Sequence, residues 1–292
     1  MPELPEVETI RRLLHATVTG RRVAGVALSG ARLREPVSRR LPARLTGRRI
    51  ADVRRVGKYL LVDFEGDLTL IAHLGMTGRF LFFAEPPRAR MRHVHARVRF
   101  DDGAQLWFQD ARRFGLLALH PTSSLADAPP LAGLGSDPLT QPLQAERLYE
   151  STRHSVVEAK TFLMDQRRIA GLGNIYVSEV LHRSGVHPRA RACDLTPSDC
   201  GALARQVGAV LDEAIRHCGT TFSDYTTLWG EPGTYAGYLR VYDRGGEPCR
   251  ACGTRIRRIV QGQRSTFFCP TCQPRRRGRA RAGRRRVAAV SS

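Results

Sequence analysis

The sequence has almost no lysine: Lys58 and Lys160 stand alone among 47 basic residues, and the others are all arginine. A bias toward arginine across the whole proteome would explain this scarcity. A lysine that survives such a bias is informative, because an arginine guanidinium keeps its proton in a protein whereas a lysine amine can lose it. Both lysines are therefore candidates for chemistry that arginine cannot perform.

The sequence also lacks an apolar run approaching the roughly 18 residues of a membrane span, and its first residues do not follow the pattern of a signal peptide. These absences predict a soluble, intracellular protein without a membrane partner. Acidic residues are few, 27 against 47 basic ones, which gives a formal net charge of +20. Such a charge predicts a polyanionic partner, most simply nucleic acid, although a basic ribosomal or transcription protein would have a similar charge.

Seven cysteines are present, an odd number, and four of them form two Cys-x2-Cys pairs separated by 16 residues: Cys249, Cys252, Cys269 and Cys272. Two such pairs can surround Zn²⁺ with four thiolates, and a closed set of four thiolates predicts one structural zinc ion. Chance pairing and an iron–sulfur site are the alternatives. The intervening residues read as the two strands of a zinc-ribbon hairpin. Arg264 lies near its tip, either as a functional cation or as a solvated charge.

Short apolar runs separated by turn residues dominate residues 21–120 and predict an antiparallel β-sandwich. Helical patterns follow from Gln144, at about 144–153, 157–168, 174–184, 197–217 and 221–229. The expected fold class is α+β with two domains, the second carrying the ribbon. The expected divisions are a β-sandwich domain with an N-terminal helix (1–125), a linker (126–143), a helical domain (144–238), the zinc ribbon (239–273) and a disordered Arg-rich tail (274–292).

The chain begins MPELPEVE. A small residue after the initiator Met permits its removal, and Pro2 would then carry a free secondary amine with a pKa of about 8. Attack of such an amine on a sugar or aldehyde carbon gives an iminium ion, and Glu3 stands beside it as an acid or base. The alternative is that Pro2 and Glu3 only open a helix, because Val7, Ile10 and Leu14 recur at helical spacing.

Four further segments carry weaker signals. GLGNIY at 171–176 predicts a helix with Asn174 as N-cap and an N-terminus able to bind phosphate, or a plain turn between helices. The segments 73–76 and 110–115 could be loops that wedge Met76 and Phe114 into a base stack, or these two residues could belong to the core. His93 and His95 alternate along a predicted strand, where they could bind a metal or a phosphate.

These motifs occur together in one order: PE, VGKY at 56–59, HLGM at 73–76, RRFG at 112–115, GLGNIY and the four-cysteine ribbon. Over residues 1–273 the chain resembles the family of formamidopyrimidine-DNA glycosylases and endonuclease VIII, which are bifunctional base-excision repair enzymes. The resemblance implies a β-sandwich that carries the nucleophile. It also implies a helix–two-turn–helix domain and a zinc ribbon, which together grip double-stranded DNA in the cleft between the domains. A monomer is expected.

By this resemblance Pro2 attacks C1′ of the damaged nucleotide and Glu3 is the general acid and proton shuttle. Lys58 matches the lysine of β-elimination, and Arg264 matches the ribbon arginine of δ-elimination and phosphate binding. The matched DNA-binding positions are His93, Arg112, Lys160 and Asn174, with Arg153 as a substitute phosphate ligand; the residues that fill the gap left by the flipped nucleotide are Met76, Arg112 and Phe114.

The PELPE opening and the intact filling trio resemble the branch that removes oxidised purines, namely 8-oxoguanine and formamidopyrimidines. The endonuclease VIII branch, which takes oxidised pyrimidines, is one alternative. A non-catalytic DNA-binding protein on the same scaffold is another, although Pro2, Glu3 and Lys58 are all present. The chain departs from the family pattern at Ala111, in the scarcity of lysine before Lys160, in residues 220–238, which resemble the loop over 8-oxoguanine, and in the Arg-rich tail.

Overall fold

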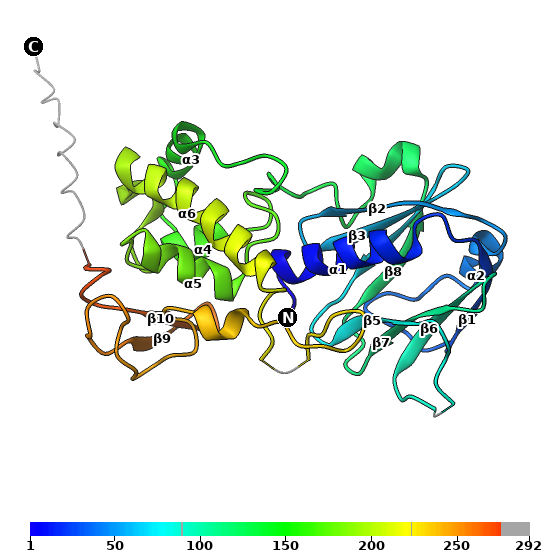
Figure 1. Ribbon diagram of the computed structural model, residues 1–292. Coiled ribbons are helices and arrows are strands. Elements are labelled where there is room, and N and C mark those ends of the chain that lie inside the picture. Colours follow the sequence, from blue (N-terminus) through cyan, green and yellow to red (C-terminus); the bar gives the residue numbers. More distant parts are fainter. Residues whose placement is uncertain (89, 223, 276–292) are drawn as a thin grey trace, which may run out of the picture.

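A computed structural model describes the chain except for residues 89, 223 and 276–292 (Figure 1). The molecule has two lobes, and the N-terminus lies where they meet. None of the helices formed by the described residues is long and apolar enough to cross a membrane. The predicted Arg-rich tail falls mostly on 276–292 and so lies outside the described residues.

The N-terminal lobe is an antiparallel β-sandwich, which confirms the prediction. One sheet has the strand order β2-β3-β4-β8 and the other β1-β6-β7-β5. Apolar side chains from both sheets, among them Leu60, Phe80 and Phe108, fill the space between them. The strands are β1 (Val23–Leu28), β2 (Ile50–Val56), β3 (Tyr59–Phe64), β4 (Leu68–His73), β5 (Gly78–Phe83), β6 (Val94–Phe100), β7 (Gln105–Asp110) and β8 (Leu116–His120).

Helix α1 (Leu4–Val18) packs along the sandwich through Val7, Ile10 and Leu14, as the spacing predicts. Its first turn is closed by a capping box, in which the Glu3 N–H donates to the Glu6 carboxylate at 2.8 Å. The N-terminal end of α1 points toward the helical lobe (Figure 1). The helix therefore carries residues 2 and 3 to the boundary between the lobes. A short helix, α2 (Leu41–Leu45), packs near β1.

The second lobe contains α3 (Ala145–Thr152), α4 (Ala159–Met164), α5 (Asn174–Arg183) and α6 (Pro197–Arg216), close to four of the five predicted helices. Tyr176, Phe162 and Leu203 are fully buried between them. Short 3₁₀ turns occur at η1 (Thr122–Asp127), η2 (Ala192–Asp194) and η3 (Tyr235–Tyr238).

The helix predicted at 221–229 is wrong: the described residues of this segment form no helix. The segment crosses from α6 to the sandwich, where Leu228 and Tyr225 are buried in the β-sandwich core. The Phe82 N–H donates to the Leu228 carbonyl at 3.0 Å. The helical spacing of these apolar residues therefore reflects contacts with another lobe rather than a helix face.

The segment 126–143 packs against the sandwich along part of its length. Ala128 and Leu131 form a small buried cluster with Leu61, Ile71 and the preceding Leu125. Further along the same segment, the Asp137 carboxylate is buried against β2. The connection is thus tied to the first lobe before it enters the second.

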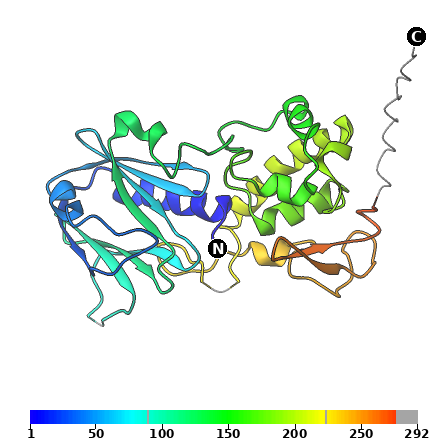
Figure 2. The same ribbon diagram turned by 180° about the vertical axis from the view of Figure 1, so that it is seen from behind.

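A two-stranded ribbon completes the second lobe, with β9 (Arg257–Gln261) paired to β10 (Arg264–Phe268). Gly262 and Gln263 form the tip with φ of +52° and +62°, the backbone that a two-residue hairpin requires. Arg264 follows directly, near the tip as predicted. Seen from behind, the ribbon lies beside the helices, at the far side of the second lobe from the sandwich (Figure 2).

Candidate active site

Glu3 lies at the boundary between the lobes and is 3% exposed. Its carboxylate accepts the backbone N–H of Ile175 at 3.0 Å and of Tyr176 at 3.3 Å, both in the first turn of α5. The free N–H groups of a helix N-terminus favour an anion. The sequence left open whether this segment binds phosphate or is a plain turn between helices, and in the structure the carboxylate of Glu3 lies at this helix end. Asn174 is the first helical residue and Gly173 the N-cap, so the predicted cap is wrong by one position.

Gly173 makes this close approach possible. A Cβ at this residue would lie 2.2 Å from Cδ of Glu3. Gly171 is similarly crowded by Leu4, and its carbonyl accepts the Leu4 N–H at 3.1 Å. The GLG segment thus lets the start of α1 and the start of α5 come into contact, and Pro2 is buried at this junction.

Glu6 is the second buried carboxyl of this junction and was not assigned a role from the sequence. It accepts the N–H of Thr220 at 2.7 Å and a hydrogen bond from the Tyr176 hydroxyl. Burial, and then the charge of Glu3, raise the pKa of Glu6. Burial and Glu6 likewise raise the pKa of Tyr176. The contacts of Glu6 with Tyr176 and Thr220 thus join α1, α5 and the start of the 220–238 segment in one polar network.

Lys58 lies in the turn between β2 and β3 and is 7% exposed. Burial lowers the pKa of its amine, an effect that the charge of Glu3 opposes and that of Arg264 reinforces. The preceding Gly57 has φ of +57°, and its N–H donates to Asp137 at 2.8 Å. The turn that contains Lys58 is therefore fixed by a hydrogen bond to Asp137, in the segment between the lobes.

Arg55 completes this support. Its guanidinium donates to Glu8 at 3.0 Å, to the Gly57 carbonyl at 2.8 Å and to Asp137 at 3.1 Å. All three charged side chains are nearly inaccessible to water. Nothing in the sequence marked Asp137 as the partner of a residue in the sandwich.

Lys160, from α4, is 2% exposed, and burial together with the charge of Arg264 lowers its pKa to about 8. Its amine donates to the Ser265 carbonyl at 3.1 Å and to the Thr266 hydroxyl at 2.6 Å. Asn174 donates to the same Ser265 carbonyl at 3.0 Å. Two helices thus fix the strand residue that follows the exposed Arg264. The charge of Glu3 acts on both lysines, so the chain's two lysines belong to one electrostatic cluster.

The two predicted wedge loops lie side by side. A Cβ on Gly75 would lie 2.5 Å from the backbone of Phe114, and the Arg112 N–H donates to the Thr77 hydroxyl at 3.0 Å. Met76 and Phe114 are 37% and 44% exposed, which contradicts the alternative that they belong to the core. The Arg112 guanidinium lies 4.9 Å from the centre of the Phe114 ring. The loops therefore present two apolar side chains and a cation together.

His73 precedes Met76 and was missed as a separate site residue, although HLGM was singled out. Burial, and the charges of Arg34 and Lys58, lower its pKa to about 3. Its Nδ1 accepts the Gly75 N–H at 2.9 Å, which leaves the proton of the neutral ring on Nε2. The ring packs against Tyr59, next to Lys58, with ring centres 4.8 Å apart.

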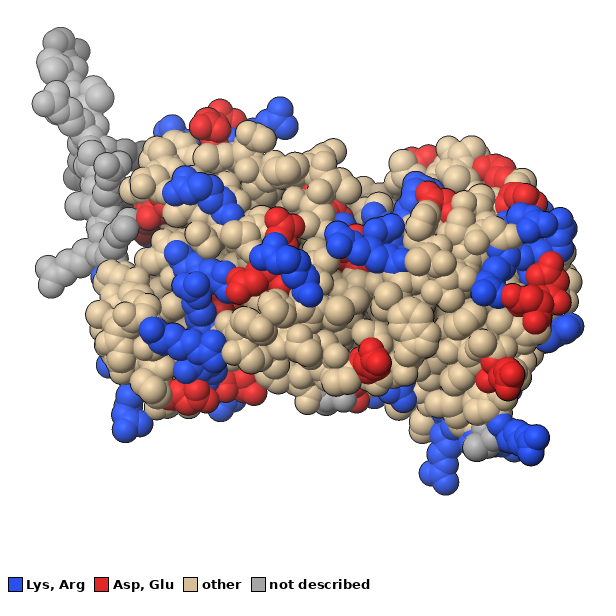
Figure 3. Space-filling view, viewed as in Figure 1, with Lys and Arg blue, Asp and Glu red and all other residues tan. Residues whose placement is uncertain are grey.

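His93 and His95 do not form a pair. His93 is exposed, precedes β6 and has φ of +61°, whereas His95 is buried, with Nε2 2.8 Å from the Asp110 carbonyl. Arg153 is exposed at the end of α3, beside Tyr149. Among the described residues, neither Arg153 nor His93 takes part in the hydrogen bonds or charge effects given above for Glu3, Lys58 and Lys160. Lys and Arg side chains are spread over both lobes on the face shown in Figure 3.

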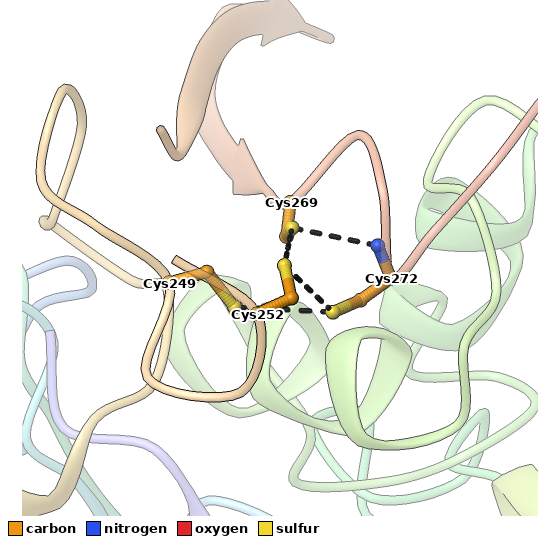
Figure 4. A group of neighbouring side chains, drawn as sticks. All are labelled: Cys249, Cys252, Cys269 and Cys272. Atoms are coloured by element: carbon orange, nitrogen blue, oxygen red, sulfur yellow. Dashed lines mark hydrogen bonds between the residues drawn. The ribbon is translucent and has the colours of Figure 1, made fainter. Parts of the chain in front are cut away.

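The four predicted cysteines come together from two loops (Figure 4). Their sulfurs all lie within 4.8 Å of one another, and Cys252 Sγ is 3.4 Å from Cys269 Sγ and 3.5 Å from Cys272 Sγ. A tetrahedral site with Zn–S bonds of about 2.3 Å separates its sulfurs by about 3.8 Å. The cluster fits one structural zinc ion, as predicted.

Comparisons with known proteins agree with this arrangement. Three family models match the chain: the formamidopyrimidine-DNA glycosylase N-terminal domain over residues 1–117, the formamidopyrimidine-DNA glycosylase H2TH domain over 134–226, and the zinc finger found in FPG and IleRS over 246–275. A formamidopyrimidine-DNA glycosylase of Thiobacillus denitrificans is 43% identical, over 94% of this chain and 100% of that protein.

Solved structures give the same result. A mutant formamidopyrimidine-DNA glycosylase of Lactococcus lactis in complex with Fapy-dG-containing DNA is similar, with a TM-score of 0.87 and 33% identity over 94% of this chain and 100% of that chain. A second is a protein named MutM in complex with DNA containing carbocyclic 8-oxo-G, with a TM-score of 0.86, 33% identity and the same coverage.

Proposed function

The chain belongs to the formamidopyrimidine-DNA glycosylase family, and from this membership and the site we propose that it excises oxidised purines from duplex DNA and then cleaves the strand. It is a DNA-repair glycosylase with one structural zinc ion. The observation that carries the proposal is the anchoring of Glu3, beside Pro2, on the first turn of α5, where its charge acts on Lys58 and Lys160. We further propose that it acts as a monomer, in the cytoplasm.

The proposed first step uses the N-terminal amine. After removal of Met1, the Pro2 nitrogen attacks C1′ of the damaged nucleotide, the C1′–N bond to the base breaks, and the base leaves with a proton. Glu3 is placed to supply and recover protons, because it is adjacent in sequence and its carboxylate is fixed by two N–H groups. The Pro2 nitrogen loses its proton, and cleavage of the C1′–O4′ bond with proton delivery to O4′ then opens the sugar and leaves an iminium ion between Pro2 and C1′.

The proposed second step breaks the strand. The iminium withdraws electrons and acidifies C2′, so loss of that proton expels the 3′ phosphate; a further elimination expels the 5′ phosphate. Hydrolysis of the remaining Schiff base then frees Pro2. Burial lowers the pKa of Lys58, which favours the neutral amine that a proton acceptor needs, and Arg264, whose charge acts on Lys58, suits the departing phosphates.

DNA binding is proposed to use side chains from both lobes. Lys160 and Asn174 come from the second lobe, and His73 offers an Nε2–H donor from the first. His93, Arg112 and Arg153 are exposed and available to phosphates. Met76, Arg112 and Phe114 are proposed to fill the stack when the nucleotide is flipped. The proposed domain divisions remain 1–125, 126–143, 144–238, 239–273 and 274–292.

The test is a cleavage assay on two duplexes, one with a single 8-oxoguanine opposite cytosine and one with a single thymine glycol. The proposal predicts faster release of 8-oxoguanine, with both phosphate termini appearing at the gap. Preference for thymine glycol would assign the chain to the pyrimidine branch. Binding without base release by the protein that lacks Met1 would support the non-catalytic alternative and contradict the proposal.

A variant series assigns the steps. Glu3→Gln should abolish base release while DNA binding persists. Lys58→Gln should slow strand cleavage at a preformed abasic site. The matched control is Glu35→Gln, an exposed carboxylate on the same lobe, which should leave both steps unchanged.

A further inference from the structure

Helix α5 contacts the zinc-binding part of the chain along its whole length. Near its start, Asn174 donates to the carbonyl of Ser265, in strand β10. In its middle, the buried carboxylate of Glu179 accepts the backbone N–H groups of Arg240, Val241 and Tyr242 at 2.8–2.9 Å. This last segment leads directly into the first cysteine pair. The helix therefore holds both the tip of the ribbon and its entry.

His182, one turn after Glu179, reaches the cysteine cluster itself. Its ring is 5% exposed, and Nε2 lies 3.4 Å from the sulfur of Cys249. Nδ1 is buried, and among the described residues it has no hydrogen-bond partner. A neutral imidazole has one N–H donor and one bare nitrogen, so the proton belongs on Nε2, where a partner exists.

The sulfurs that need such a donor are the buried ones. Cys249 and Cys269 are 3% and 0% exposed, so water does not solvate their thiolates. A buried anion requires hydrogen bonds from the protein. For Cys269 the Cys272 N–H is 3.4 Å from the sulfur. For Cys249 the nearby nitrogen is that of His182, from a different element of the fold.

We propose that His182 is a positioning residue of the zinc centre: its Nε2–H donates to the Cys249 thiolate and thereby locks the zinc-binding loops onto helix α5. The donor does not replace a ligand, because the four sulfurs already complete the set. The same helix binds Glu3 at its other end. One helix of ten residues thus joins the zinc centre to the catalytic carboxylate.

The test uses the zinc-loaded full-length protein and two substitutions. His182→Phe keeps a ring of similar volume and removes the N–H; His182→Gln keeps an N–H at a similar reach. Zinc release to a chromogenic chelator should be about tenfold faster or more for His182→Phe, since removing such outer hydrogen bonds costs about 10–100-fold in metal affinity. Release from His182→Gln should stay close to that of the unsubstituted protein. His187→Phe is the matched control, because His187 packs on Phe268 of the same ribbon.

Two further readouts separate hydrogen bonding from packing. With Co²⁺ in place of zinc, the thiolate charge-transfer band should move to lower energy in His182→Phe and return in His182→Gln. In the unsubstituted protein, imidazole ¹⁵N correlations should show His182 with its proton on Nε2, a result that needs no variant to fold. A proton on Nδ1, zinc release at the unsubstituted rate in His182→Phe, or equal acceleration in both variants would overturn the proposal.

Discussion

The carboxylate of Glu3 accepts the backbone N–H of Ile175 at 3.0 Å, across 172 positions of sequence. The contact brings the residue after the proposed nucleophile onto the first turn of a helix in the other lobe. It means that the site exists only when the two lobes are correctly joined.

Gly173→Ala should disable catalysis while the protein still folds. The new Cβ would lie 2.2 Å from Cδ of Glu3 and must displace that carboxylate. A misplacement of about 1 Å in a catalytic group typically costs about 100-fold in rate. We expect a loss of at least that size in base release, measured in single-turnover assays. Gly133→Ala, where a Cβ meets nothing within 4 Å, is the control and should be fully active.

Asp137→Asn should destabilise the protein through Arg55. The substitution removes one of the two carboxylates that hold this buried guanidinium. Breaking a buried ion pair typically costs about 3–5 kcal/mol in the free energy of unfolding. Denaturant unfolding should show a loss of this order, whereas exposed Asp127→Asn should change stability little. An unchanged unfolding midpoint for Asp137→Asn would contradict the role given to this contact.

Lys160 should make DNA affinity pH-dependent. Its pKa of about 8 lies below the usual 10.5, so the free protein loses this charge as pH rises through 8. Affinity for duplex DNA at low salt should therefore fall between pH 7 and pH 9. Over the same range the slope of log K against log salt should shrink by about 0.9, the value for one phosphate contact. The free energy of unfolding should change in the opposite direction. Between the two pKa values the unfolded chain binds more protons than the folded one, so the cost of burying this amine falls and stability rises as pH rises.

The control separates Lys160 from other basic groups. Lys160→Gln should bind DNA more weakly at pH 7 and lose the pH step. Arg168→Gln, from the same surface groove, should also bind more weakly but retain the step. If DNA binding by Lys160→Gln keeps the full pH dependence, another group is responsible for it and the prediction is wrong.

Cys218→Gly should stabilise the protein. Cys218 lies just after α6 with φ of +56°, a left-handed conformation that costs a residue with a Cβ about 1–2 kcal/mol. Glycine relieves this strain, but it also loses more conformational entropy on folding. We therefore expect a net gain of about 0.5–1 kcal/mol in the free energy of unfolding. Thermal unfolding should show a rise of about 1–3 °C. Cys193→Gly, at a residue without positive φ, should instead lower stability.

Local pattern was sufficient for much of this molecule. Short apolar runs separated by turn residues predicted the sandwich, the helical pattern at 197–217 predicted α6, and the cysteine spacing predicted the zinc cluster. Each of these signals lies within one short stretch of chain. The opening residues already suggested an amine nucleophile at Pro2 and an acid or base at Glu3, and the family resemblance then supplied specific roles for Lys58 and Arg264.

What the sequence could not predict depends on contacts between distant segments. The apolar residues at 221–229 gave a helical pattern, yet Tyr225 and Leu228 are buried in the other lobe. Glu6 is part of the N-terminal motif MPELPEVE, but its burial depends on contacts with Tyr176 and Thr220, which are distant in sequence. Similarly, the structural role of Asp137 depends on its ion pair with Arg55, 82 positions earlier, which no local pattern indicates.

The central claim is that the amine of Pro2 forms the covalent intermediate, and borohydride trapping on an 8-oxoguanine duplex tests it most directly. Reduction of the iminium should leave one protein–DNA cross-link, mapped by mass spectrometry to a peptide that begins at Pro2. The cross-link should persist in Lys58→Arg and vanish when the N-terminus is acetylated. A cross-link on Lys58 or Lys160, or none from protein that lacks Met1 and still releases the base, would contradict the account.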